Sequence, residues 1–65
     1  PSSTNDPIEN LNFLLDENQM NASDLGHILG NRQLGSKILR RERQLSKTHI
    51  RILSNYFRVS ADLLL

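Results

Sequence analysis

The stretch NASDLGHILGNRQLGSKILR, residues Asn21–Arg40, decides the fold. Its first half opens with a helix-start signal, because Asn21 can cap a helix and an acid follows three residues later. Apolar residues then recur at helical spacing. Gly30 can adopt the left-handed conformation that ends a helix at low cost. These signals predict a helix of about two turns over Ala22–Leu29.

A second short helix is predicted directly after Gly30, with Asn31 as its cap and a span of about Gln33 to Arg40. On a helical wheel that turns about 100° per residue, the two sides of this segment differ in character. Hydrogen-bond donors share one arc, formed by Ser36, Arg40, Gln33 and Lys37. The opposite side carries Leu34, Gly35, Ile38 and Leu39. We therefore expect one side to pack against the domain and the other to present a row of donors.

Helix-start signals also occur on both sides of this stretch. Asp6 caps a predicted helix that runs to about Asn18, and a proline stands where its missing N–H costs nothing. Ser46 caps a further helix with apolar residues at helical spacing, and Ser60 can start a last short turn with the terminal leucines. No segment shows the period-two alternation of a strand. The sequence therefore predicts an all-α fold.

Length and composition limit the chain to one small domain. With 65 residues we expect a flexible lead-in over residues 1–5 and a single domain over residues 6–65. The chain lacks cysteine, which excludes disulfides and thiolate metal sites and fits a cytoplasmic protein. No apolar run approaches the length of a membrane span, so no membrane partner is expected. Because the first residue is Pro1 rather than Met, we expect a fragment or a processed product.

The charges are divided unevenly along the chain. Residues 1–31 hold five acids and no Lys or Arg, whereas residues 32–65 hold all eight basic residues and two acids. The two parts carry −5 and +6, which sum to the net charge of +1. This asymmetry indicates an anionic partner for the second part. The alternative is that two solvated helix faces simply differ in sign.

The donors on the second short helix suit the edges of DNA bases. Gln pairs with adenine, Lys or Arg with guanine, and Ser with either. The basic residues that follow, Arg41, Arg43 and Lys47, suit phosphates, which fix the register of a protein on DNA without reading its sequence. The alternative is an ordinary amphipathic helix whose polar side lies in water. Two short helices joined by a tight glycine turn, the second of them basic, favour the DNA interpretation.

The segment Met20–Leu65 resembles the Cro/C1 (Xre-type) helix-turn-helix domain and looks most like the subgroup found in HigA-type antitoxins. The shared positions agree in register along the segment: Ser23-Asp24-Leu25-Gly26, Leu29-Gly30, Ser36, Ile38-Leu39, Leu45-Ser46, Ile50, Leu53 and Phe57. The resemblance implies a five-helix, lambda-repressor-like bundle that binds double-stranded operator DNA as a homodimer. It also implies a transcriptional repressor that controls its own toxin-antitoxin operon and neutralises a partner ribonuclease toxin.

The resemblance also implies which side chains contact DNA. Base-reading contacts are expected from Arg32, Gln33, Ser36 and Lys37. Phosphate contacts are expected near the start of the first short helix, where free N–H groups favour an anion, and from the basic residues after the second. These phosphate-binding candidates are Asn21, Ser23, Arg40, Arg41, Arg43 and Lys47.

Two positions depart from the family pattern. Gly35 stands where the family usually has a β-branched aliphatic residue, and a glycine inside a helix costs about 0.5–1 kcal/mol relative to alanine. We therefore expect the second short helix to be less firmly seated. Arg41 stands where the family usually has the glycine that ends this helix. Either Arg41 takes a costly left-handed conformation, or the helix extends into Arg41-Glu42.

Other chemistries find little support in the sequence. His27 follows Asp24 by three residues, but a metal site needs three or four ligands and His49 is the only other histidine. Ser36 has no evident His and acid partners for nucleophilic catalysis. We therefore expect no enzyme activity, cofactor, metal or small-molecule substrate. The aromatic residues are expected to lie in the core: Phe13, Tyr56 and Phe57.

A second interpretation of the function stays open. The same fold can act as a protein-interaction module that binds a partner such as a toxin without binding an operator. The acidic first helix supports this interpretation because it can dock a basic protein. Gly35 supports it too, since a poorly anchored reading helix would weaken operator affinity. The basic donors on the second short helix argue against it.

Overall fold

Four α-helices and one short 3₁₀ helix make up the computed structural model, which describes residues 6–65. They are α1 (Pro7–Glu17), α2 (Ala22–Leu29), α3 (Arg32–Leu39), α4 (Lys47–Phe57) and the 3₁₀ helix η1 (Ala61–Leu64). No strand occurs in this range, so the all-α prediction is confirmed. The expected lead-in over residues 1–5 lies outside the described residues.

The fifth α-helix of the expected bundle is absent from residues 6–65, and that prediction was wrong. The 3₁₀ helix after the cap at Ser60 spans the four residues Ala61–Leu64 and is closed by short i→i+3 hydrogen bonds. Leu63 N donates to Ser60 O at 3.1 Å, and Leu65 N donates to Asp62 O at 3.3 Å. The poorer hydrogen-bond geometry of a 3₁₀ helix limits it to short runs, so this turn takes the place of the expected fifth α-helix.

The helix starts follow the capping signals in the sequence. At α2, Asn21 Oδ1 accepts from Asp24 N at 2.9 Å, and the Asp24 carboxylate accepts from Asn21 N at 3.0 Å. Asp6 caps α1, and Ser46 caps α4 by accepting from the backbone of His49 at 3.2 Å. Asn31 caps α3, as predicted, but α3 begins and ends one residue earlier than expected. Its Oδ1 accepts from Gln33 N at 3.0 Å, which fixes Arg32 as the first helical residue.

The α-helices end on the same kind of backbone conformation. Each α-helix is followed by a residue in the left-handed region, namely Gln19 (φ 56°), Gly30 (φ 85°), Arg41 (φ 65°) and Arg58 (φ 58°). After α3, the N–H of Glu42 donates to Lys37 O at 2.9 Å and the N–H of Arg41 donates to Ile38 O at 3.0 Å. This pattern closes a helix on a left-handed residue. Of the two alternatives for Arg41, the left-handed conformation is the one that occurs.

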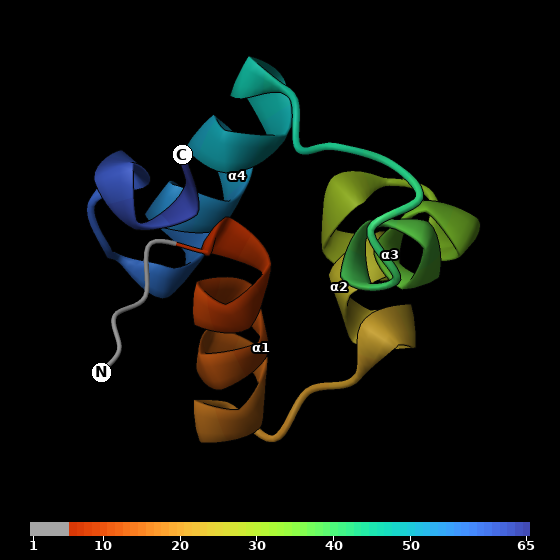
Figure 1. Cartoon of the computed structure of the whole chain (residues 1–65). Helices are drawn as coiled ribbons and strands as arrows, with labels where there is room; N and C mark the ends of the chain where they lie inside the picture. The colour runs from red at the N-terminus through yellow and green to blue at the C-terminus, as the bar shows by residue number, and fades with distance from the viewer. Residues whose placement is uncertain (1–5) are drawn as a thin grey trace.

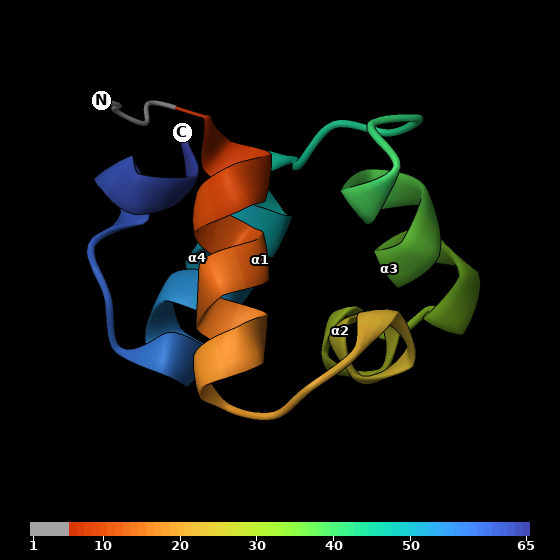
Figure 2. The same ribbon diagram turned by 60° about the horizontal axis from the view of Figure 1, so that its bottom comes forward.

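The core joins two groups of helices. Figures 1 and 2 show α2 and α3 together on one side of the molecule, and α1, α4 and η1 on the other. The nine buried apolar side chains come from all five elements: Ile8, Leu11, Leu14, Leu15, Leu25, Ile38, Ile50, Leu53 and Leu64. The side chain of Asn10 donates to Leu63 O at 2.8 Å and ties η1 to α1. The two ends of the described chain are therefore held together.

Two of the three aromatic residues do not lie in the core, so that prediction was wrong for them. Phe13 is 61% exposed and Tyr56 is 56% exposed, whereas Phe57 is half-buried and packs against the core. Helical spacing alone does not show which flank of an apolar stripe a neighbouring element covers.

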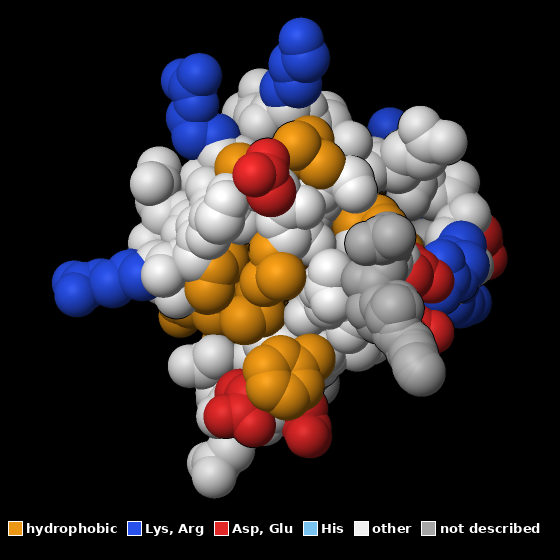
Figure 3. Space-filling model, turned by 60° about the vertical axis from the view of Figure 1, so that its left-hand side comes forward, with side chains coloured by type: hydrophobic (Ala, Val, Ile, Leu, Met, Phe, Trp, Pro, Cys, Tyr) orange, Lys and Arg blue, Asp and Glu red, His pale blue; other side chains and the backbone are white. Residues whose placement is uncertain are grey.

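Figure 3 views the side of the molecule on which η1 lies, where hydrophobic side chains gather above an acidic lower edge. No helix within residues 6–65 has the length and apolar character needed to cross a membrane.

Candidate nucleic-acid interface

The candidate interface is built on an unusually close contact between α2 and α3. Gly35 lies against the backbone of Gly26 in this contact, and both glycines are buried. A Cβ atom added to Gly35 would lie 2.5 Å from Gly26 N and would also meet the carbonyl oxygen of Ala22. A Cβ atom added to Gly26 would lie 2.5 Å from the Cα of Arg32. The two backbones therefore touch where side chains would normally separate them.

This contact overturns the expectation that Gly35 loosens the seating of α3. The absence of a Cβ allows α3 to approach α2 closely, which a β-branched residue on the same backbone would prevent. Ile38 lies one turn further along the same side of α3 and is completely buried. The packing side of α3 is thus anchored by one glycine and one isoleucine.

The buried side of α3 fixes which side chains face outward. With about 100° per residue, the direction opposite Gly35 and Ile38 lies between Gln33 and Arg40. Both of these residues are exposed. Arg32 is also exposed and lies on one flank, whereas Ser36 and Lys37 are half-buried. The four residues expected to read bases therefore divide into two exposed side chains and two partly covered ones.

The arginines after α3 occupy different environments. Arg41 forms a paired contact with the carboxylate of Asp6, at 3.1 Å from Nη1 to Oδ1 and 2.6 Å from Nη2 to Oδ2. This guanidinium is held by the cap of α1 but its side chain is more than half exposed, so a phosphate would have to compete with the Asp6 carboxylate for it, and the expected phosphate contact stays a prediction. Arg40 contacts Glu42 only loosely, at 3.7 Å, and both side chains are more than half exposed. Such exposed pairs contribute little free energy, so Arg40 remains able to bind an anion.

The contact between Arg41 and Asp6 also perturbs the ionisation of both groups. The hydrogen bonds from Arg41 hold the pKa of the Asp6 carboxyl below its ordinary value of 3.8, and a backbone hydrogen bond from Ile8 acts in the same direction. The carboxylate in turn raises the pKa of Arg41. The pair joins the start of α1 to the residue that closes α3, 35 positions apart in the sequence.

The remaining phosphate candidates are exposed. Arg43 lies in the loop between α3 and α4, and Lys47 is the first residue of α4. Within residues 6–65 neither side chain forms an ion pair. Both can therefore meet a polyanion without first breaking an ion pair to the described part of the domain.

The start of α2 differs from the anion site that the sequence suggested. Asn21 Oδ1 is committed to the cap, and the Asp24 carboxylate takes the backbone N–H of Asn21. A protein carboxylate therefore already occupies part of this helix start, and its charge opposes a phosphate. The hydroxyl of Ser23 and the side-chain NH₂ of Asn21 are exposed and can still donate.

Neither histidine joins a cluster of ionisable groups. His27 is exposed on α2. His49 Nδ1 accepts from the backbone of Ser46 at 3.4 Å and completes the cap of α4. In the described part of the chain, no group of three or more His, Cys, Asp or Glu side chains is placed to hold a metal ion. The role of His49 was not foreseen, although its position three residues after the capping Ser46 is the signal for it.

Two further features were missed from the sequence. Glycines nine positions apart, one on the inner side of each short helix, are the signal for the contact between Gly26 and Gly35. The pairing of Asp6 with Arg41 leaves no local signal, because it depends on how α1 lies against the end of α3.

In comparisons with known proteins, no family model, curated sequence or solved structure matches this chain.

Proposed function

We propose that this chain is a helix-turn-helix domain that binds double-stranded DNA and lays α3 in the major groove. The observation that carries the proposal is the outward side of α3, where Gln33 and Arg40 are exposed opposite a buried glycine contact. A reading helix needs donors on one side and a rigid support on the other. The close contact of α3 with α2 supplies that support.

Each side chain has a proposed role in this complex. Gln33 and Arg32 read base edges, with Ser36 and Lys37 contributing from the flanks of the helix. Arg40, Arg43 and Lys47 bind phosphates, and Asn21 and Ser23 add donors at the start of α2. Arg41 can add a phosphate contact only in competition with Asp6, which holds its guanidinium.

The biological setting is proposed from the resemblance to HigA-type antitoxins. In that setting the domain has a lambda-repressor-like arrangement and binds an operator as a homodimer. It represses its own operon in the cytoplasm and neutralises a ribonuclease toxin. Of these roles, α2 and α3 account only for the binding of operator DNA.

The test compares preferred and random duplexes. A preferred site is first selected from randomised duplexes, and affinities are then measured by fluorescence anisotropy. Gln33→Ala is expected to weaken binding to the preferred site by about 1–3 kcal/mol and to have far less effect on random DNA. Arg43→Ala is expected to weaken both alike, because a phosphate contact carries no base information.

Asn55→Ala is the matched control, because it removes an exposed side-chain amide from α4. It is expected to change neither affinity. Equal losses on both duplexes would remove Gln33 from the reading role. Failure of the unmodified domain to bind any duplex at low salt would reject the proposal as a whole.

A second candidate function rests on α1. Phe13 is 61% exposed there, and Asp16 and Glu17 are exposed close to it in the helix. An exposed aromatic ring beside acids suits a contact with a basic protein. If the domain bound a basic partner but no DNA, and Phe13→Ala abolished that binding, the protein-interaction function would replace the first proposal.

A further inference from the structure

An apolar groove with a basic rim lies on the domain, apart from the outward side of α3. It has a volume of about 510 Å³, and its walls come from the start of α1, the loop between α3 and α4, the start of α4 and the C-terminal segment. Its lining residues are Pro7, Ile8, Arg41, Arg43, Gln44, Leu45, Lys47, Ile50, Leu64 and Leu65. None of these residues is acidic, although the whole chain holds seven acids.

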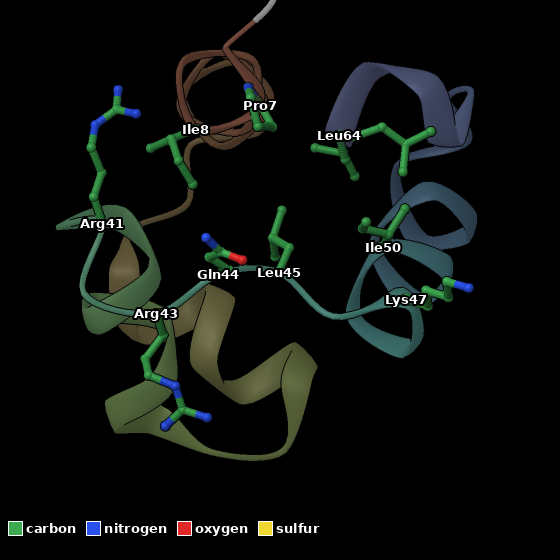
Figure 4. Close-up of a pocket in the computed structure, with 10 residues that line it drawn as sticks. Pro7, Ile8, Arg41, Arg43, Gln44, Leu45, Lys47, Ile50 and Leu64 are labelled. Atoms are coloured by element: carbon green, nitrogen blue, oxygen red, sulfur yellow. The ribbon is translucent and has the colours of Figure 1, made fainter.

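The side chains in the groove are arranged by type. In Figure 4 the apolar side chains of Ile8, Leu45 and Leu64 point toward a shared space. The charged ends of Arg43 and Lys47 lie at the rim and point away from that space in different directions. Neither of these two cations has an acidic partner within residues 6–65. The groove thus combines an apolar floor with positive charge on two sides.

We propose that this groove binds an acidic amphipathic segment of a partner protein. An apolar stripe on that segment would cover Ile8, Leu45 and Leu64, and carboxylates on its two flanks would meet Arg43 and Lys47. Short helices recognised in this way insert anchors spaced i, i+3, i+4 and i+7 into an apolar groove. A small amphiphile with a single anionic group could satisfy only one side of the rim.

The test uses a designed peptide of about 15 residues, long enough for several helical turns, with Leu at the four anchor positions and Glu on both flanks. Binding is followed through backbone amide chemical shifts of the intact chain. Shifts are expected at Ile8, Leu45, Ile50 and Leu64. A scrambled peptide of the same composition is expected to cause none. A peptide with Lys in place of Glu is expected to bind at least about tenfold more weakly, because it repels the rim.

Matched variants separate the floor from the rim. Leu65→Ser removes an exposed apolar side chain from the groove and is expected to weaken peptide binding about fivefold. Leu63→Ser makes the same change two positions earlier, outside the groove, and is expected to have no effect. Lys47→Gln is expected to weaken binding about threefold, whereas Arg51→Gln on the same helix leaves it unchanged.

Three outcomes would overturn the proposal. The acidic and basic peptides could bind equally well, or the shifts could fall outside the groove. Decanoate, a chain with one carboxylate, could cause the same shifts at lower concentration than the peptide, which would assign the groove to small amphiphiles. None of these measurements depends on DNA.

One consequence does rest on the proposed function. Because Arg43 and Lys47 also serve as proposed phosphate contacts, the acidic peptide should displace a duplex from the domain, and Leu65→Ser should weaken that displacement without changing DNA affinity. If the domain binds no DNA, this competition experiment fails, but the chemical-shift experiment still shows whether the peptide binds in the groove. If the domain binds DNA but the peptide shifts nothing, the groove proposal fails alone.

Discussion

At the scale of single residues, two glycines determine how α3 is held. A glycine inside a helix normally costs about 0.5–1 kcal/mol relative to alanine because it loses more backbone freedom on folding. Here Gly35 lies against Gly26 with no space for a side chain, so the close backbone contact offsets that cost. Gly30 serves a different purpose, because its φ of 85° ends α2 and nothing lies near the position of its missing Cβ.

Gly35→Ala is expected to destabilise the domain by about 2–3 kcal/mol, because the new methyl group would force the backbones of α2 and α3 apart. Helix propensity alone predicts the opposite, a gain of nearly 1 kcal/mol. Urea denaturation followed by circular dichroism measures the difference. Gly30→Ala is the control and should cost only about 1 kcal/mol, through its left-handed backbone. A stabilised Gly35→Ala variant would show that the glycine contact is not tight in solution.

At the scale of helices, the predictable features were those with local causes. The bounds of α2 followed from an asparagine cap and a glycine stop, and those signals act within a few residues. The contact that holds α3 was misjudged because it depends on the facing residue of another helix. The exposure of Phe13 and Tyr56 was missed for a similar reason, since a helical wheel shows an apolar stripe but not which other element packs on it. The pair of Asp6 with Arg41 joins distant segments and leaves no local pattern.

That pair gives the domain a defined pH dependence. The pKa of Asp6 is lowered in the folded state, so its contribution to stability is present above the ordinary carboxyl pKa of 3.8 and is lost as the pH falls through the lower folded value. Asp6→Asn keeps a capping side chain of similar quality but removes the charge. The variant should be less stable than the unmodified domain at pH 7, and the two should converge below about pH 4.

Denaturation midpoints between about pH 2 and pH 7 measure this difference, over a range that includes the ordinary carboxyl pKa of 3.8. Asp16→Asn is the control, because Asp16 is exposed and makes no ion pair with the described residues. It should not reproduce the effect. A constant gap between Asp6→Asn and the unmodified domain at every pH would mean that the ion pair contributes nothing to stability.

At the scale of the whole molecule, the division of charge is partly internal. The acidic first half and the basic second half are joined by Asp6 and Arg41, so one charge of each sign is used within the domain. Of the eight cations in the second half, Arg41 pairs with Asp6 and Arg40 lies 3.7 Å from Glu42, which leaves six without an ion pair to the described residues. A net charge of +1 therefore conceals a chain whose second part is strongly basic, a distribution that would attract a polyanion to that part.

This polarity predicts the salt dependence of DNA binding. Each phosphate contact adds about 0.9 to the slope of the logarithm of affinity against the logarithm of salt concentration. Lys47→Gln should reduce that slope by about 1, whereas Arg51→Gln on the same helix should leave it unchanged. Titrations between about 50 and 200 mM salt measure both. A slope that Lys47→Gln does not alter would exclude Lys47 from the phosphate contacts.

The contact between Gly26 and Gly35 also has a kinetic meaning. Its two residues are nine positions apart, so the chain has only a short loop to close before α2 and α3 meet, and such loops close in about 10–100 ns. The contact between Asn10 and Leu63 spans 53 positions, so a much longer loop has to close before it forms. We therefore expect α2 and α3 to pack together before α1 meets η1 during folding, and the contact between α1 and η1 to be the first to open.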